Sequence, residues 1–311
     1  MPTRQGSVHL FRFAGVDVFL HWAWFLVAAI EIAGRTRNYS SIIWNVLEYL
    51  ALFVIVLMHE YGHALSCRQV GGKADQIVLW PLGGVAYVNP PPRPGATLWS
   101  LAAGPLVNVA LLFIFIPMGF LGGAMHWKQT APDVRTFLMA LVGINVGLLI
   151  FNLLPIYPLD GGQILRSLLW FGLGRARSLM AATVIGMVGV AALVALALYL
   201  QSGWLAIMAL FILGNCWAGM KHARAMIRLG KLPQHSAYSC PECKTSPPAA
   251  AFWTCFRCSQ HSQLLIKRFD LFQTQGLCPD CGQPAETVRC PFCGTESPLT
   301  AWTAPVPVAA P

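Results

Sequence analysis

Long apolar stretches recur through the first 220 residues of the chain. A hydrocarbon core about 30 Å thick needs roughly 20 apolar residues in a helix, and six stretches meet this requirement. The last two are separated by very few residues, which predicts a tight helical hairpin. The pattern therefore predicts an all-α polytopic membrane protein with a six-helix transmembrane bundle. The six stretches cover residues 17–34, 43–66, 98–122, 135–155, 179–201 and 203–220.

Residues 76–88 are also apolar, but they are too short and too broken to span a bilayer. Two short runs of β-forming residues lie on either side of Pro81-Leu82-Gly83-Gly84, and Pro and Gly at this position are typical of a turn. We expect a small membrane-associated β-hairpin that dips into the protein from the cytoplasmic side. An amphipathic surface loop is the alternative.

The composition agrees with a membrane protein. Hydrophobic residues make up 56% of the chain and charged residues 11%, whereas soluble domains carry roughly 25% charged residues. The net charge of +9 would suggest nucleic-acid binding in a soluble protein. In a membrane protein it indicates Lys and Arg held on the cytoplasmic side, next to anionic lipid.

The distribution of Lys and Arg predicts the orientation in the membrane. By the positive-inside rule, the side richer in Lys and Arg is cytoplasmic. We expect an integral, multi-pass protein with both termini in the cytoplasm, and a first span that is retained, since no small-residue cleavage site follows it. The richer side would hold Arg4, Arg12, Arg68, Lys73, Arg93, Arg166, Arg175, Arg177, Lys221, Arg224, Arg228 and Lys231, and the other side Arg35, Arg37, Lys128 and Arg135.

The second predicted span contains His59-Glu60-Tyr61-Gly62-His63. Positions i and i+4 of a helix lie on one face, so both imidazoles can bind one metal ion. Glu60 is next to them and can accept a proton from metal-bound water, as in zinc proteases. A coincidental pair of histidines is the alternative. Ionisable groups in the middle of a span are costly, however, and are functional by default.

Catalytic zinc usually has three protein ligands and a water. Asp160 is the best remaining candidate, because it lies at the end of the fourth predicted span, where Pro155, Pro158, Gly161 and Gly162 interrupt the helix. The interruption would let the carboxylate turn inward. The alternative is a helix-terminating turn with Asp160 as a solvated cap.

These residues together resemble the site-2 protease family of intramembrane zinc metalloproteases. The resemblance lies in His59-Glu60-x-x-His63 combined with Asn152-x-x-Pro155-x-x-Pro158-Leu159-Asp160-Gly161-Gly162. Ala103-Gly104-Pro105-Leu106-Val107-Asn108, His21 and the Pro81–Gly84 turn are also similar to the family, and the likeness covers roughly residues 10–220. It implies that Asp160 is the third zinc ligand and that Asn152 positions the substrate backbone.

The resemblance implies an intramembrane zinc metalloendopeptidase that cuts membrane proteins in or near their transmembrane segments, as in regulated intramembrane proteolysis. Glu60 would act as general base on zinc-bound water and return the proton to the leaving amine. Asn152 would stabilise the oxyanion, and Asn108 would position substrate or pack between spans. The 76–88 hairpin would pair with a locally unwound substrate. The alternatives are a non-catalytic zinc-bound scaffold or receptor signalling through the tail, and a transporter.

The composition changes after residue 231, and we predict a transmembrane domain over 1–231, a linker over 232–239, a Cys-rich region over 240–296 and a disordered tail over 297–311. Each Cys-x-x-Cys pair can present two thiolates, and two pairs complete a tetrahedral zinc site. Pairing in order gives two zinc-ribbon-like modules, 240–258 and 278–293. A crossed pairing and disulfides are the alternatives, although a reducing cytoplasm disfavours disulfides. The four pairs are Cys240/Cys243, Cys255/Cys258, Cys278/Cys281 and Cys290/Cys293.

The predicted cofactors are therefore one catalytic zinc and two structural zincs. A site closed by four cysteines has no open coordination position, so the tail should be non-catalytic and could bind a cytoplasmic protein partner. Basic and aromatic residues alternate over 251–272, a pattern that can bind nucleic acid. We interpret these residues as a small aromatic core and do not expect nucleic acid. The expected partners are a transmembrane protein substrate and the lipid bilayer.

Overall fold

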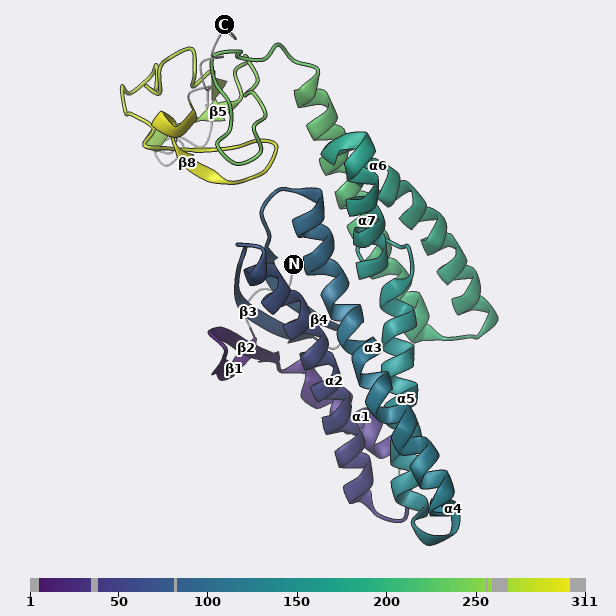
Figure 1. Ribbon diagram of the computed structural model, residues 1–311. Coiled ribbons are helices and arrows are strands. Elements are labelled where there is room, and N and C mark those ends of the chain that lie inside the picture. The colour runs from purple at the N-terminus through teal and green to yellow at the C-terminus, as the bar shows by residue number, and fades with distance from the viewer. Residues whose placement is uncertain (1–5, 35–38, 81–82, 256, 259–267, 303–311) are drawn as a thin grey trace, which may run out of the picture. The chain divides into compact units, whose positions relative to one another are not determined.

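The chain forms two compact units in the computed structural model, Met1–Ala218 and Gly219–Pro311 (Figure 1). The structure describes residues 6–34, 39–80, 83–255, 257–258 and 268–302. The first unit is mainly helical, and the second is a small Cys-rich region with short strands. Each unit is described in turn.

Five helices of the described chain are long and apolar enough to cross a membrane. They confirm the predicted spans from the second to the sixth as long helices. Two shorter helices, α1 (Ala23–Gly34) and α4 (Trp127–Thr130), complete the set before the Cys-rich region. The five long helices are α2 (Ile42–Gln69), α3 (Pro94–Ala124), α5 (Pro132–Leu153), α6 (Asp160–Tyr199) and α7 (Gly203–Gly230).

The predicted first span, 17–34, differs from the structure. Residues 7–21 form the antiparallel strands β1 (Ser7–Phe13) and β2 (Val16–His21). The helix that follows, α1, has only 12 residues and is about 18 Å long. In β2 the buried residues alternate with partly exposed ones, which is the period of a strand. The stretch 17–34 was predicted as a span from its apolar length, and that criterion does not detect the period of a strand.

The predicted hairpin is confirmed as β3 (Lys73–Trp80) and β4 (Gly83–Asn89), which pair in antiparallel fashion. It belongs to a larger four-stranded sheet of order β1-β2-β3-β4, in which β2 and β3 run parallel. Buried residues of β2 and β3 share one core with Val56 and Ala64 of α2. Because β4 is the last strand of this sheet, its outer edge has no strand partner in the described chain.

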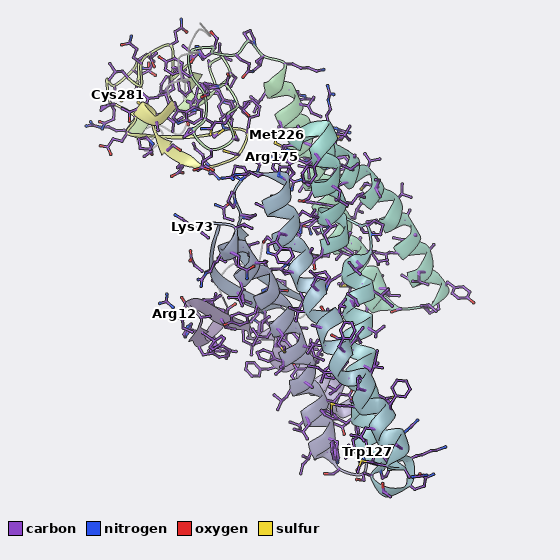
Figure 2. The ribbon with its side chains drawn as sticks, in the orientation of Figure 1. Arg12, Lys73, Trp127, Arg175, Met226 and Cys281 are labelled. Atoms are coloured by element: carbon purple, nitrogen blue, oxygen red, sulfur yellow. The ribbon has the colours of Figure 1, made fainter. Side chains whose placement is uncertain are left out.

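Helix α6 doubles back on itself at Gly174, where φ is 75° and ψ is 167°. A Cβ atom on Gly162 would lie 2.4 Å from the backbone nitrogen of Tyr157, and one on Gly186 would lie 3.0 Å from the same atom. A straight helix would separate these two glycines by about 36 Å. The two halves therefore run side by side, and Figure 2 shows Arg175, at the bend, and Trp127 at opposite ends of the bundle.

The second unit folds around the aromatic residues Phe272 and Trp302, together with Leu271 and Val288. Residues 297–302, predicted to be disordered, instead complete the strand β8 and form a short 3-10 helix. Trp302 is fully buried there, and its carbonyl accepts a hydrogen bond from the Ser239 N–H at 2.8 Å. Residues 303–311 lie outside the described chain. The strands are β5 (Trp253–Thr254), β6 (Arg268–Phe269), β7 (Thr287–Arg289) and β8 (Glu296–Pro298).

Candidate metal centre

Helix α2 carries His59, Glu60 and His63, and all three are buried, with exposed fractions of 3%, 5% and 6%. The helix can approach α3 closely because residue 62 is glycine. A Cβ atom on Gly62 would lie 2.7 Å from the Ala103 carbonyl oxygen. The i, i+4 spacing then directs both imidazoles towards α3 and the start of α6.

Asp160 is the first residue of α6 and lies against both histidines. Its Oδ2 atom is 3.0 Å from His59 Nε2 and 3.3 Å from His63 Nε2, and the two Nε2 atoms are 3.2 Å apart. Ligands at about 2.0–2.1 Å from a tetrahedral zinc are about 3.3–3.4 Å apart. The three atoms therefore fit the ligand set of a zinc ion with a fourth position left open.

The Nδ1 atom of each histidine faces a hydrogen-bond acceptor. Each Nδ1 can therefore carry the ring proton, which leaves the Nε2 lone pair directed at the metal position. His63 Nδ1 is 2.8 Å from the backbone carbonyl oxygen of Ser100. His59 Nδ1 is 2.6 Å from Asn108 Oδ1. Asn108, predicted to position substrate or to pack between spans, thus contacts a candidate zinc ligand.

Glu60 is held beside the sheet. Its Oε2 atom accepts a hydrogen bond from the Ala86 N–H at 2.9 Å. A Cβ atom on Gly84 would lie 2.3 Å from Glu60 Cγ and 2.5 Å from Oε1. The glycine of the predicted turn motif therefore leaves room for the Glu60 carboxylate, and the outer edge of β4 lies next to it.

Gly104, the glycine of the motif in the third predicted span, also leaves room for functional side chains. A Cβ atom there would lie 2.2 Å from His63 Nε2 and 2.9 Å from His59 Nε2. Proline follows it without ending α3. Glycine at 104 thus lets the backbone of α3 lie directly against the Nε2 atoms of the two imidazoles.

Two further predicted residues, Asn152 and His21, make no hydrogen bond to the three ligand atoms in the described chain. Asn152 is in the last turn of α5, partly buried. His21 ends β2, where its Nδ1 accepts the Ala23 N–H at 3.2 Å and its ring centroid is 4.8 Å from that of Trp80. The sequence interpretation missed Asn145, whose side chain bonds to Asn108.

The eight tail cysteines form two groups, and the in-order pairing is wrong. The outer group joins the first pair to the last, Cys240/Cys243 with Cys290/Cys293, and the inner group joins Cys255/Cys258 with Cys278/Cys281. The aromatic core causes this nesting, since Cys240 and Cys290 pack with Trp302 and bring the first and last pairs together. All ten cysteines of the chain are free thiols.

Both groups fit a tetrahedral metal. The Sγ–Sγ distances are 3.6 Å and 3.7 Å in the outer group and 3.6 Å and 3.9 Å in the inner one. Sulfur ligands at about 2.3 Å from zinc are about 3.75 Å apart. Three of the four pairs share one turn, in which the fourth residue after the first cysteine has positive φ, at Lys244, Gly282 and Gly294. This turn directs both thiols of a pair to the same side.

The thiols within each group differ in their surroundings. The backbone N–H of Cys258 lowers the pKa of the partly buried Cys255 thiol to about 7. Burial raises the pKa of the Cys240 thiol to about 11. Each group thus contains one thiol whose pKa is lowered, Cys255 in the inner group and Cys293 in the outer one, and the thiolate is the form that binds a metal.

Comparisons with known proteins found one family profile and several relatives. Residues 48–130 and 117–196 match the profile described as Peptidase family M50. A zinc metalloprotease of Methanocaldococcus jannaschii is 33% identical over 180 residues, which are 58% of this chain and 50% of that protein. Stage IV sporulation protein FB of Bacillus subtilis is 33% identical over 120 residues, covering 37% of this chain and 38% of that protein.

The chain thus spans about half the length of the Methanocaldococcus jannaschii relative. A solved structure, the site-2 protease from the same organism, aligns with a TM-score of 0.49 and 28% identity, over 69% of this chain and 95% of that one. The residues matched to the family profile include His59, Glu60, His63 and Asp160.

Proposed function

Because the chain belongs to the site-2 protease family, peptidase family M50, we propose that it is an intramembrane zinc metalloendopeptidase. Its substrates are membrane proteins, cut in or near their transmembrane segments. The observation that carries the proposal is the convergence of His59 Nε2, His63 Nε2 and Asp160 Oδ2 within 3.3 Å, next to Glu60. The chain is an integral, multi-pass membrane protein, with five helices long and apolar enough to span a bilayer among its described residues.

Zinc held by His59, His63 and Asp160 would polarise the scissile carbonyl and lower the pKa of water. Glu60 accepts a proton from the attacking water and donates it to the leaving amine. The Ala86 N–H holds the carboxylate through Oε2, so the orientation of Glu60 depends on the sheet. Asn152, at the end of α5, would donate a hydrogen bond to the developing oxyanion.

The outer edge of β4 supports a role in substrate binding. A transmembrane helix hides its carbonyl groups in internal hydrogen bonds, so it must unwind locally before it is cut. An unwound segment that adds to β4 as a further strand would lie beside Glu60, since Ala86 of β4 contacts that carboxylate. Asn108 contacts His59, which favours a role in orienting the metal ligand over direct contact with substrate.

The two cysteine groups support two structural zincs in addition to the catalytic one. Each group is closed by four thiols, so neither leaves a coordination position for substrate. The distribution of Lys and Arg supports a cytoplasmic location for both termini and the tail. For the tail we propose a cytoplasmic protein as the partner, and not nucleic acid. Its aromatic side chains Trp253, Phe269 and Phe272 pack in its own core, so they do not offer a surface on which bases could stack.

The test compares purified wild-type protein with Glu60→Gln, His59→Ala and, as a control, Asp75→Asn, whose carboxylate is 83% exposed. Glu60→Gln should retain the metal and lose proteolysis of a transmembrane substrate by at least a factor of 100, the lower range for general acid–base catalysis. His59→Ala should lose both the metal and proteolysis, and Asp75→Asn should retain both. Full proteolysis by Glu60→Gln would sink the proposed mechanism. Crosslinking in cells that express Glu60→Gln would then identify the trapped substrate.

A further inference from the structure

We propose that Asn145 is a positioning residue for the metal centre, acting on His59 through Asn108. The three side chains come from three helices, α5, α3 and α2, and form a continuous hydrogen-bonded chain. Asn108 Nδ2 donates to Asn145 Oδ1 at 2.7 Å, and Asn145 Nδ2 donates to the Asn108 backbone carbonyl at 2.8 Å. Asn108 Oδ1 is in turn 2.6 Å from His59 Nδ1. The inference rests on the proposed zinc site.

A single backbone group determines the direction of every bond in this chain. The Asn108 carbonyl can only accept, so the atom of Asn145 that faces it must be the NH₂ group. The oxygen of Asn145 then faces Asn108 and requires the NH₂ group of Asn108 on that side. This leaves Asn108 Oδ1, an acceptor, facing His59. The imidazole must therefore carry its proton on Nδ1, which keeps the Nε2 lone pair free for the metal.

Burial makes this arrangement depend on the two asparagines. Asn108 and Asn145 are each 0% exposed, so water does not replace a missing partner in this part of the bundle. Without Asn145, the Asn108 amide can rotate by half a turn and present NH₂ to His59. The opposite tautomer of His59 would then be favoured, with its proton on Nε2, where it blocks metal binding.

The two histidines differ in this respect. The Nδ1 proton of His63 is held by the backbone carbonyl of Ser100, which no side-chain substitution removes. Only His59 depends on side chains for its orientation. Asn145 lies outside the motifs that carry the family resemblance, and its role follows from the contact with Asn108 alone.

The alternative role for Asn145 is packing, since hydrogen bonds between buried asparagines also join membrane helices. Metal affinity separates the two roles. In purified full-length protein, cobalt is titrated against a chelator, and the imidazole- and carboxylate-bound ion is read from its visible spectrum, apart from the thiolate charge-transfer bands of the cysteine groups. Asn145→Leu should weaken binding at the centre 10–100-fold, as is usual when an outer partner of a ligand is lost.

The matched control is Asn45→Leu, because Asn45 is also a buried asparagine of the bundle, 4% exposed, but its amide has no hydrogen-bond partner in the described chain. It should leave cobalt affinity unchanged. Asn108→Leu should weaken cobalt binding to the same extent as Asn145→Leu. The double variant should bind cobalt no more weakly than Asn108→Leu does, because both asparagines act on His59 through the same hydrogen-bonded chain. Asn145→Ala serves as the second variant if the larger side chain prevents folding.

Unchanged cobalt affinity and spectrum in Asn145→Leu and Asn145→Ala, with only a lowered melting temperature, would assign Asn145 to packing and overturn the inference. Additive effects in the double variant would also overturn it. Failure of the proposed function has a different signature, since the wild-type protein would then bind no cobalt that His59→Ala removes.

Discussion

At the scale of single residues, the room around the metal centre is defined by glycines opposite the functional side chains. Gly62 brings α2 against α3, Gly84 makes room for Glu60, and Gly104 makes room for His59 and His63. Each of these positions would otherwise place a Cβ atom within 3 Å of a neighbouring atom. The glycines in the motifs are thus explained by packing, and the chemistry belongs to the polar side chains that they accommodate.

Gly104→Ala should abolish metal binding at the centre while the fold persists. Its Cβ would lie 2.2 Å from His63 Nε2, and the imidazole cannot move away without breaking its hydrogen bond to Ser100. Gly123→Ala, in the same helix and with open space around it, is the control and should stabilise the protein by up to about 1 kcal/mol. Metal content and thermal unfolding measure both effects. Retention of stoichiometric metal at the centre by Gly104→Ala would contradict this geometry.

At the scale of the elements, the bend in α6 positions Asp160. The first half of the helix carries Asp160 at its start, and the second half returns to pack Gly186 and Gly189 against Ile156 and Tyr157. The loop that precedes Asp160 is therefore held between two halves of one helix. This arrangement explains why the carboxylate, at the end of an interrupted segment, lies in the bundle and not at its surface.

Gly174→Ala should destabilise the membrane unit by about 1–3 kcal/mol, because a non-glycine residue is strained at this backbone conformation. Gly172→Ala is the matched control, since it is two residues away, has open space for a Cβ and lacks a positive φ. Thermal unfolding in detergent compares the two variants. Equal melting temperatures would show that the chain does not turn at Gly174.

The nested cysteine pairing can be tested by counting metal ions in double variants. Cys243→Ser/Cys293→Ser alters one group in the nested arrangement and should lose one zinc per chain. Cys243→Ser/Cys281→Ser alters both groups and should lose two. The in-order pairing predicts a loss of two zincs from either double variant. Elemental analysis gives the counts, with Cys216→Ser as a control, because Cys216 is a buried cysteine of the first unit that belongs to neither group.

At the scale of the whole molecule, the distribution of Lys and Arg predicts the orientation in the membrane. Arg175, Arg177 and Lys73 fall in segments that we assign to the cytoplasmic side, and Lys128 lies beside Trp127, at the other end of the bundle in Figure 2. Protease added to sealed inside-out vesicles should therefore remove the Cys-rich unit, whereas right-side-out vesicles should protect it. The reverse result would invert the predicted topology and place the cysteines in a compartment that favours disulfides.

Local pattern predicted a large part of this fold. Five spans follow from apolar length, the hairpin follows from β-forming runs around a turn, and the shared face of His59 and His63 follows from helical spacing. The first span was wrong because residues 16–21 are apolar in content but alternate with the period of a strand. The hydrophobic content of these residues indicates a transmembrane helix, whereas their period indicates a strand. The predicted span rested on hydrophobic content alone.

The sequence by itself determined the features that depend on neighbours along the chain: the long apolar helices, the His-Glu-x-x-His face and the four Cys-x-x-Cys pairs. The tertiary structure alone decided which of these meet. His59 and Asp160 are 101 positions apart, the facing cysteines of the outer group are 47 and 53 positions apart, and Asn108 and Asn145 are 37 positions apart. Helical and strand periods describe only a few neighbouring residues, so they carry no information on contacts at such separations. Those contacts depend on how whole elements pack, and here that packing is set by glycines between helices and by a buried tryptophan in the tail.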